Sequence, residues 1–202
     1  MPPSSHTTID RLTNDLDYFA TTPDAPIQLL PSFEAALTGD GLSVERLRVS
    51  DSFIRLQIGS GEDSTLVDLA FDARMARPVS TELGTTLSVS ELAADKTLAL
   101  FGRAAARDIV DVDALVRQFG WDELEQLATE KDSGFDRQVM VGMLRTFDSI
   151  DPRDFDLDDA SYDQLRVRVG DWIRTLASVR DTDVGLSREP EQHRRTDRGR
   201  ER

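Results

Sequence analysis

Two aspartates stand one residue apart near the start of this 202-residue chain, in the segment 11–19, RLTNDLDYF. In a β-strand, side chains alternate between faces, so Asp15 and Asp17 project from one face while Leu16 and Tyr18 project from the other. The two carboxylates repel each other unless a cation lies between them, and Mg²⁺ is a cation that takes such oxygen ligands. The alternative is the solvated edge of an acidic protein.

A third carboxylate stands on a second expected strand, 65–72. Apolar residues alternate along this segment and leave Asp68 on the opposite face. If the two strands pair, side chains that face each other come within about 5 Å. Asp68 then completes a three-carboxylate cluster with Asp15 and Asp17. A cluster of this kind holds one or two Mg²⁺ ions for in-line phosphoryl or nucleotidyl transfer.

A lysine stands inside an apolar helix predicted over 90–102, with Ser90 as its N-cap and Gly102 at its end. The 24 basic residues include only two lysines, so Lys96 suggests a need for a compact ammonium that binds phosphate. A surface lysine with a buried stem is the alternative. Asp111, on the next predicted helix, could orient Lys96 or a nucleotide, or belong to an ordinary charged helix face.

These segments, in this order, resemble the AbiEii/AbiGii-type nucleotidyltransferase toxins, members of the DNA-polymerase-β-like superfamily found in type IV toxin–antitoxin and abortive-infection systems. The family pattern runs Arg-x-Ser/Thr-x-Asp-φ-Asp, a third acid on a neighbouring strand, Lys-x-x-Ala-φ, and Arg-x-x-x-Arg-Asp-φ-x-Asp. The matching residues, in the same order, are Arg11, Thr13, Asp15 and Asp17; Asp68; Lys96 and Ala99; and Arg103, Arg107, Asp108 and Asp111.

The pattern of turns and apolar residues along the chain predicts an α+β fold, a small mixed sheet followed by a C-terminal helical bundle. The family resemblance adds the expected function. It implies Mg²⁺-dependent transfer of a nucleoside monophosphate from an NTP to an RNA hydroxyl, with tRNA as the favoured acceptor, and a cognate antitoxin as partner. The implied roles are catalysis for Asp15, Asp17, Lys96 and Asp111, metal binding for Asp15, Asp17 and Asp68, and nucleotide binding for Arg11, Thr13 and Lys96. Thr13 also matches a regulatory phosphoacceptor of some relatives, or it is a plain strand residue.

One family element has no counterpart, the Gly-Gly-Ser/Thr turn ten to fifteen residues before the aspartate pair. The first glycine here is Gly39. Backbone N–H groups that cradle phosphate need glycine for close approach. Two explanations stay open. Either the true start lies upstream, or the chain is a degraded copy, a catalytically inactive paralogue that acts as a protein-binding module.

Composition limits the cellular compartment and the partners that we expect for this protein. Cysteine is absent, and neither a membrane span nor a signal peptide is visible, so we expect a cytoplasmic protein. The formal charge of −14 argues against nonspecific nucleic-acid binding, and we expect no DNA partner. RNA binding would need a local basic patch, or else these arginines are solvated charges. The candidates are Arg46, Arg48, Arg55, Arg74 and Arg77.

Turns marked by glycine and proline, and the lack of apolar periodicity near the C-terminus, predict three segments. These are a sheet domain over 1–89, a helical domain over 90–180 and a disordered tail over 181–202. We expect an acidic loop over 151–159, and Trp121 and Trp172 packed inside the bundle. The expected elements are a helix over 26–37, strands over 42–49, 53–58 and 65–72, and helices over 90–102, 108–119, 122–130, 135–147 and 161–179.

Overall fold

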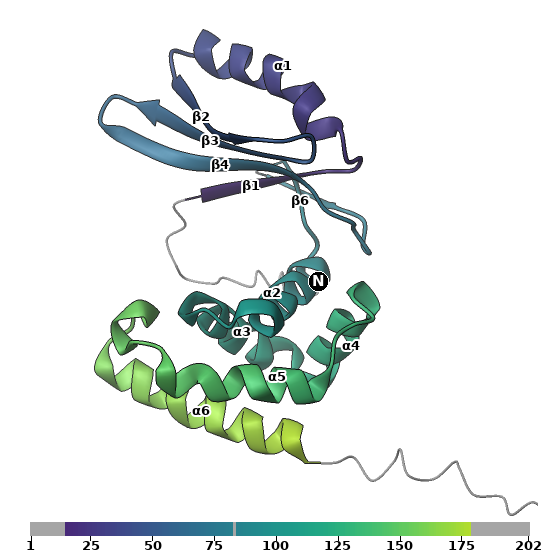
Figure 1. Ribbon diagram of the computed structural model, residues 1–202, viewed down its shortest axis with the longest axis vertical. Coiled ribbons are helices and arrows are strands. Elements are labelled where there is room, and N and C mark those ends of the chain that lie inside the picture. Colours follow the sequence, from purple (N-terminus) through teal and green to yellow (C-terminus); the bar gives the residue numbers. More distant parts are fainter. Residues whose placement is uncertain (1–14, 83, 179–202) are drawn as a thin grey trace, which may run out of the picture.

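The computed structural model describes residues 15–82 and 84–178 and places a small sheet above a layer of helices (Figure 1). The sheet has four strands in the order β1-β4-β3-β2. Strand β1 pairs with β4 in parallel, and the other pairs are antiparallel. The mixed α+β architecture predicted from the sequence is therefore confirmed. The strands are β1 (Asp15–Ala20), β2 (Ser43–Val49), β3 (Phe53–Ser60) and β4 (Asp63–Phe71).

Helix α1 (Ala25–Gly39) covers the face of the sheet that points away from the other helices (Figure 1). A small apolar core fills the space between α1 and the sheet. It consists of the buried residues Leu30, Ile54, Leu56, Ile58, Val67 and Leu69. The alternation of apolar and polar residues along β3 and β4 puts these side chains on one face, and so leaves the polar positions facing the helical layer.

Helices α2 (Val89–Arg103) to α6 form the second layer. Their buried stripes build a larger core, in which each fully buried leucine contributes about 2 kcal/mol. Trp121 and Trp172 pack edge to face within it, with ring centroids 5.4 Å apart, as the sequence predicted. The remaining helices are α3 (Ala106–Phe119), α4 (Trp121–Lys131), α5 (Arg137–Leu144) and α6 (Asp159–Ala177).

Helix α2 differs from its prediction at both ends. Its N-cap is Ser88, not Ser90, because the Ser88 backbone is extended and its Oγ accepts a hydrogen bond from the Glu91 N–H at 3.2 Å. The helix runs past Gly102 and ends at Arg103. Ala104 then takes the left-handed conformation, with φ of 47°, as a C-cap residue.

Two short features were not predicted. Strands β5 (Val79–Thr81) and β6 (Gly84–Thr86) form a hairpin between the sheet and α2, too short and too exposed to carry an apolar pattern. The acidic segment 151–159 contains a 3₁₀ turn, Pro152–Phe155, whose Phe155 side chain is buried in the helical core. This segment is therefore partly packed rather than wholly a surface loop.

Candidate active site

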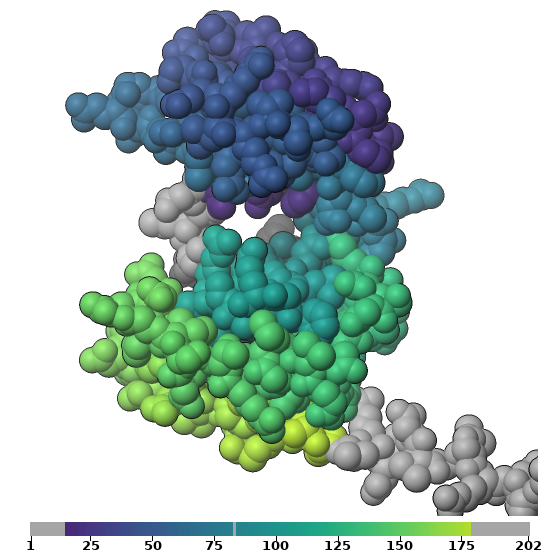
Figure 2. All heavy atoms as spheres, in the orientation of Figure 1, coloured from purple at the N-terminus to yellow at the C-terminus, as the bar shows by residue number. Residues whose placement is uncertain are grey.

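The polar face of the sheet brings the predicted acidic residues together. Asp17 on β1 lies directly opposite Asp68 on β4, and Asp15 lies two residues before Asp17 on the same strand face. All three line a cavity of about 250 Å³ between the sheet and the helices. In the space-filling view a hollow separates the purple and blue sheet layer from the teal and green helices (Figure 2). The predicted placement on adjacent strands is confirmed.

Asp68 has a partner that the sequence did not reveal. Arg55, its neighbour across the β3–β4 ladder, donates Nε to Oδ1 at 2.8 Å and Nη2 to Oδ2 at 2.6 Å. Asp68 is 7% exposed, so this bidentate pair occupies both oxygens of a buried carboxylate. The alternation along β3 is the signal that could have found it, since Ile54 and Leu56 face the core and Arg55 therefore faces the cavity.

The contact with Arg55 bears on the metal-binding role of Asp68, which stays a prediction. Among the residues that the structure describes, no group of three or more histidines and carboxylates is arranged to hold a metal ion. The physical reason is that the Arg55 guanidinium already supplies the positive charge beside Asp68. A metal bound here would rest on Asp15 and Asp17, and the nucleotide phosphates would complete its shell, as is common for Mg²⁺.

The ionised Asp17 carboxylate is destabilised by its surroundings, and a bound cation would stabilise it. Burial raises the pKa of the Asp17 carboxyl above its ordinary value of 3.8, and the charges of Asp15 and Asp68 raise it further. Lys96 and Arg55 oppose this shift. A carboxylate crowded by like charges is a good ligand for a hard cation, because metal binding removes the repulsion. The donor set of Asp15 and Asp17 therefore fits Mg²⁺ by chemistry and by charge.

Lys96 enters the cavity from the helical wall. It lines the same cavity as the aspartates, and its Nζ lies 2.8 Å from Oδ2 of Asp111 on α3. The Asp111 side chain is 1% exposed and the Lys96 side chain 31% exposed. The predicted orientation of Lys96 by Asp111 is thus observed, although the catalytic and nucleotide-binding roles of both residues remain predictions.

Two arginines complete the helical wall. Arg103 donates Nε and Nη2 to the buried Asp108 at 2.8 and 2.7 Å, and the same carboxylate accepts the Ala105 N–H at the start of α3. Asp108 therefore shapes the turn between α2 and α3 and aims Arg103 at the cavity. Arg107 also lines the cavity, and none of the described carboxylates pairs with it.

Other sequence predictions fall elsewhere. Arg11 and Thr13 lie outside the described residues. The proposed basic patch is not supported by three of its members: Arg46 pairs with Glu34 at 2.5 Å, Arg55 with Asp68 at 2.6 Å, and Arg74 with Asp95 at 2.7 Å. Their charge is neutralised within the protein.

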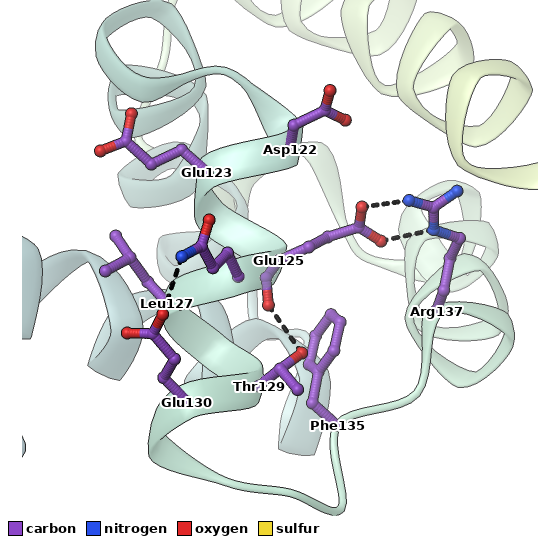
Figure 3. A pocket seen from close by; sticks show the side chains of 9 residues that line it. Asp122, Glu123, Glu125, Leu127, Thr129, Glu130, Phe135 and Arg137 are labelled. Carbon is purple, nitrogen blue, oxygen red and sulfur yellow. Dashed lines mark hydrogen bonds and ion pairs between the residues drawn. The ribbon is translucent and has the colours of Figure 1, made fainter. Parts of the chain in front are cut away.

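A wider hollow of about 1010 Å³ lies along α4 (Figure 3). None of its described lining residues also lines the cavity that contains Asp15 and Asp17. Its lining is mostly acidic. Arg137, the one cation among the described residues that line it, is hydrogen-bonded to Glu125, with Nε 2.6 Å from Oε1. Thr129 donates to the Glu125 carbonyl within the helix at 2.8 Å. The arrangement of groups is structural, so size alone does not make this hollow a reactive site.

The family described as nucleotidyl transferase AbiEii toxin, type IV TA system, matches residues 5–184. No curated protein matches the chain. The fold is similar to JHP933 from Helicobacter pylori, with a TM-score of 0.51 and 15% identity over 83% of this chain and 77% of that one. It is also similar to MenT4, a nucleotidyltransferase toxin from Mycobacterium tuberculosis, with a TM-score of 0.52 and 16% identity over 84% and 70%.

Proposed function

Because the chain belongs to the AbiEii family of nucleotidyltransferase toxins, we propose that it moves a nucleoside monophosphate from an NTP onto an RNA hydroxyl, with tRNA as the favoured acceptor. The observation that carries this proposal is the two-walled cavity. Carboxylates from β1 and β4 line one side, and Lys96, Arg103 and Arg107 line the other. A metal–nucleotide complex, with a cation at one end and phosphates at the other, matches that polarity.

In this proposal Asp15 and Asp17 hold Mg²⁺, which would neutralise phosphate charge and lower the pKa of the attacking hydroxyl. Lys96 and Arg107 bind the phosphates from the opposite wall, and Asp111 fixes the position of Lys96. The acceptor oxygen bonds to the α-phosphorus while the bond to pyrophosphate breaks. Positioning and charge stabilisation supply most of the catalysis in reactions of this type.

The proposed partners follow from this chemistry. The reaction needs an NTP and an RNA, and the family is defined within a toxin–antitoxin system, so we propose a cognate antitoxin that restrains it. We place the reaction in the cytoplasm, where these substrates occur. None of the described helices is long and apolar enough to cross a bilayer.

The test is a transfer assay with purified protein, Mg²⁺, each α-labelled NTP in turn, and tRNA or a total RNA pool. Label should become attached to RNA, and Asp15→Asn should lower the rate at least about a hundredfold, which corresponds to about 2.7 kcal/mol of transition-state stabilisation. Asp51→Asn, in the exposed turn between β2 and β3, is the matched control and should transfer at the wild-type rate. No transfer by the wild-type protein with any NTP would contradict the proposal and favour the inactive binding module.

A further inference from the structure

A second cluster of charged residues lies beside the cavity, between the sheet and the helical layer. We call it the joint cluster; it consists of Asp72 and Arg74 after β4, Glu91 and Asp95 on α2, and Lys131 on α4. Lys131 Nζ lies 2.6 Å from Glu91 and also contacts Asp95, and Arg74 Nη1 lies 2.7 Å from Asp95. Asp72 contacts both cations, at 3.1 and 3.5 Å. Five charged groups from three segments therefore meet at one point.

Glu91 ties the chain segment that leaves the sheet directly to α2. Its carboxylate, 1% exposed, accepts hydrogen bonds from the backbone N–H groups of Met75 at 3.1 Å and Ala76 at 2.8 Å. It receives Lys131 Nζ as well. A buried carboxylate with charged and backbone donors on both oxygens is held rigidly, because each lost contact would leave a buried charge uncompensated.

The joint cluster touches both walls of the candidate active site. The Arg74 guanidinium lies 3.8 Å from the centroid of the Phe19 ring. Phe19 is two residues after Asp17, and it lies on the same face of β1. On the other wall, Asp95 binds Arg74 and is followed directly by Lys96. The cluster thus links a carboxylate-bearing strand to a lysine-bearing helix within two residues of each.

Such a link is needed because the two layers have separate apolar cores. The sheet core and the helical core share no residue among those described. Layers joined without a common core can move relative to each other unless their interface is large and apolar. Here the contacts beside the cavity are mostly polar, so the joint cluster is the feature that can set the spacing of its walls.

We propose that Arg74 and Lys131 are positioning residues, which hold β1 and α2 at the separation that lets one nucleotide reach both walls. They do not touch the nucleotide. They act through Phe19 on the strand and through Glu91 and Asp95 on the helix. The consequence for nucleotide binding rests on the proposed function, whereas the fixed spacing of the layers does not.

The spacing can be measured directly, because the chain contains no cysteine. Spin labels on Glu45→Cys in β2 and Asp163→Cys in α6, both exposed positions, report the distance between the two layers by pulsed electron resonance. We expect a narrow distribution in the parent and a broadened or shifted one in Arg74→Gln and Lys131→Met. Arg153→Gln, which breaks an exposed ion pair to Asp151 away from the joint cluster, should leave the distribution narrow.

Two further variants guard against a simple folding defect. Phe19→Leu removes the ring under Arg74 and leaves no buried charge without a partner, so it should fold and still broaden the distribution. Lys131→Arg keeps the charge and should restore part of the narrow distribution. A distribution unchanged from the parent in folded Arg74→Gln and Phe19→Leu would overturn the proposal.

Nucleotide titration separates this inference from the proposed function. Titration of a fluorescent NTP in the presence of Mg²⁺ should show binding at least about tenfold weaker in Arg74→Gln than in Arg153→Gln. If the parent binds no NTP while the distance distribution still broadens, the proposed function fails and the positioning role of the joint cluster stands. If the parent binds NTP and the distribution does not change, the positioning role fails alone.

Discussion

The ion pair between Lys96 and Asp111 predicts an unequal response to removal of its two partners. Asp111 is 1% exposed and Lys96 is 31% exposed, so the carboxylate depends on the pair more strongly than the ammonium does. Removing one partner of a buried pair costs about 3–5 kcal/mol. Water near Lys96 screens the interaction, which reduces the expected cost of Lys96→Met to about 2–3 kcal/mol.

Substitution of the other partner, Asp111, should cost less stability. Asp111→Asn replaces the buried charge by a neutral amide, and the ammonium of Lys96 can turn to water, so we expect a loss of about 1 kcal/mol. In the double variant the carboxylate and the lysine are both gone. Its free energy of unfolding should exceed the value expected from adding the two single losses by at least about 1 kcal/mol.

Urea unfolding followed by tryptophan fluorescence measures these differences, because Trp121 and Trp172 are both buried in the helical core. The dependence on urea concentration should keep its slope, and the melting temperature of Lys96→Met should fall by about 4–12 °C. Strict additivity of the two single substitutions, or a larger loss for Asp111→Asn than for Lys96→Met, would refute this reasoning. A loss below about 1 kcal/mol for Lys96→Met would indicate a lysine that serves only its ligand.

Two further predictions concern stability. Burial alone would raise the pKa of Glu91, but hydrogen bonds from Lys131 and the Ala76 N–H, with the nearby positive charges, hold it below its ordinary value of 4.5. The stabilisation from the ionised Glu91 carboxylate is therefore present above about pH 4.5 and is lost as the pH falls through the lower pKa of the folded state. Urea midpoints of unfolding, measured between about pH 6 and 3, should fall more steeply for the wild type than for Glu91→Gln. Equal slopes for the two proteins would argue against this role of Glu91. Asp156 is exposed and takes a left-handed backbone with φ of 52°, so Asp156→Gly should raise the free energy of unfolding by about 0.5 kcal/mol in urea titrations, and a decrease would count against strain there.

Much of the candidate site could be predicted from the sequence because strand alternation is a strong constraint. A shift of one residue would have moved Val67 out of the core, so Asp68 had to face away from α1. The same rule places Asp15 with Asp17. Helical spacing likewise put Lys96 and Asp111 on neighbouring helices that could meet, and the structure joins them at 2.8 Å.

The remaining features depend on contacts between distant segments. The sequence predicts Arg55 and Arg74 only as candidates for RNA binding. The pairing of Arg55 with Asp68 depends on the register of β3 against β4, which the sequence pattern of one strand does not give. Arg74 is inserted between Phe19 and α2, a contact between segments that are distant in the sequence. At the N-terminus of α2, Ser88 and Ser90 are equally good caps by type, and only the backbone conformation selects between them.

The distribution of charge across the cavity is compatible with the proposed nucleotide substrate, even though the protein has a formal charge of −14. Exposed charges are screened beyond about 8 Å at physiological salt, so the distant acids contribute little inside a small cavity. Within it, Lys96 and Arg103 are each held by a buried aspartate, whereas Arg107 has no such partner among the described residues. The opposite wall holds Asp17, whose pKa is raised by burial and also by the charges of Asp15 and Asp68. In the proposed function, a metal would compensate the carboxylates and a phosphate would pair with the arginine. A ligand that brings both together would then require the two walls of the cavity to be kept at one spacing.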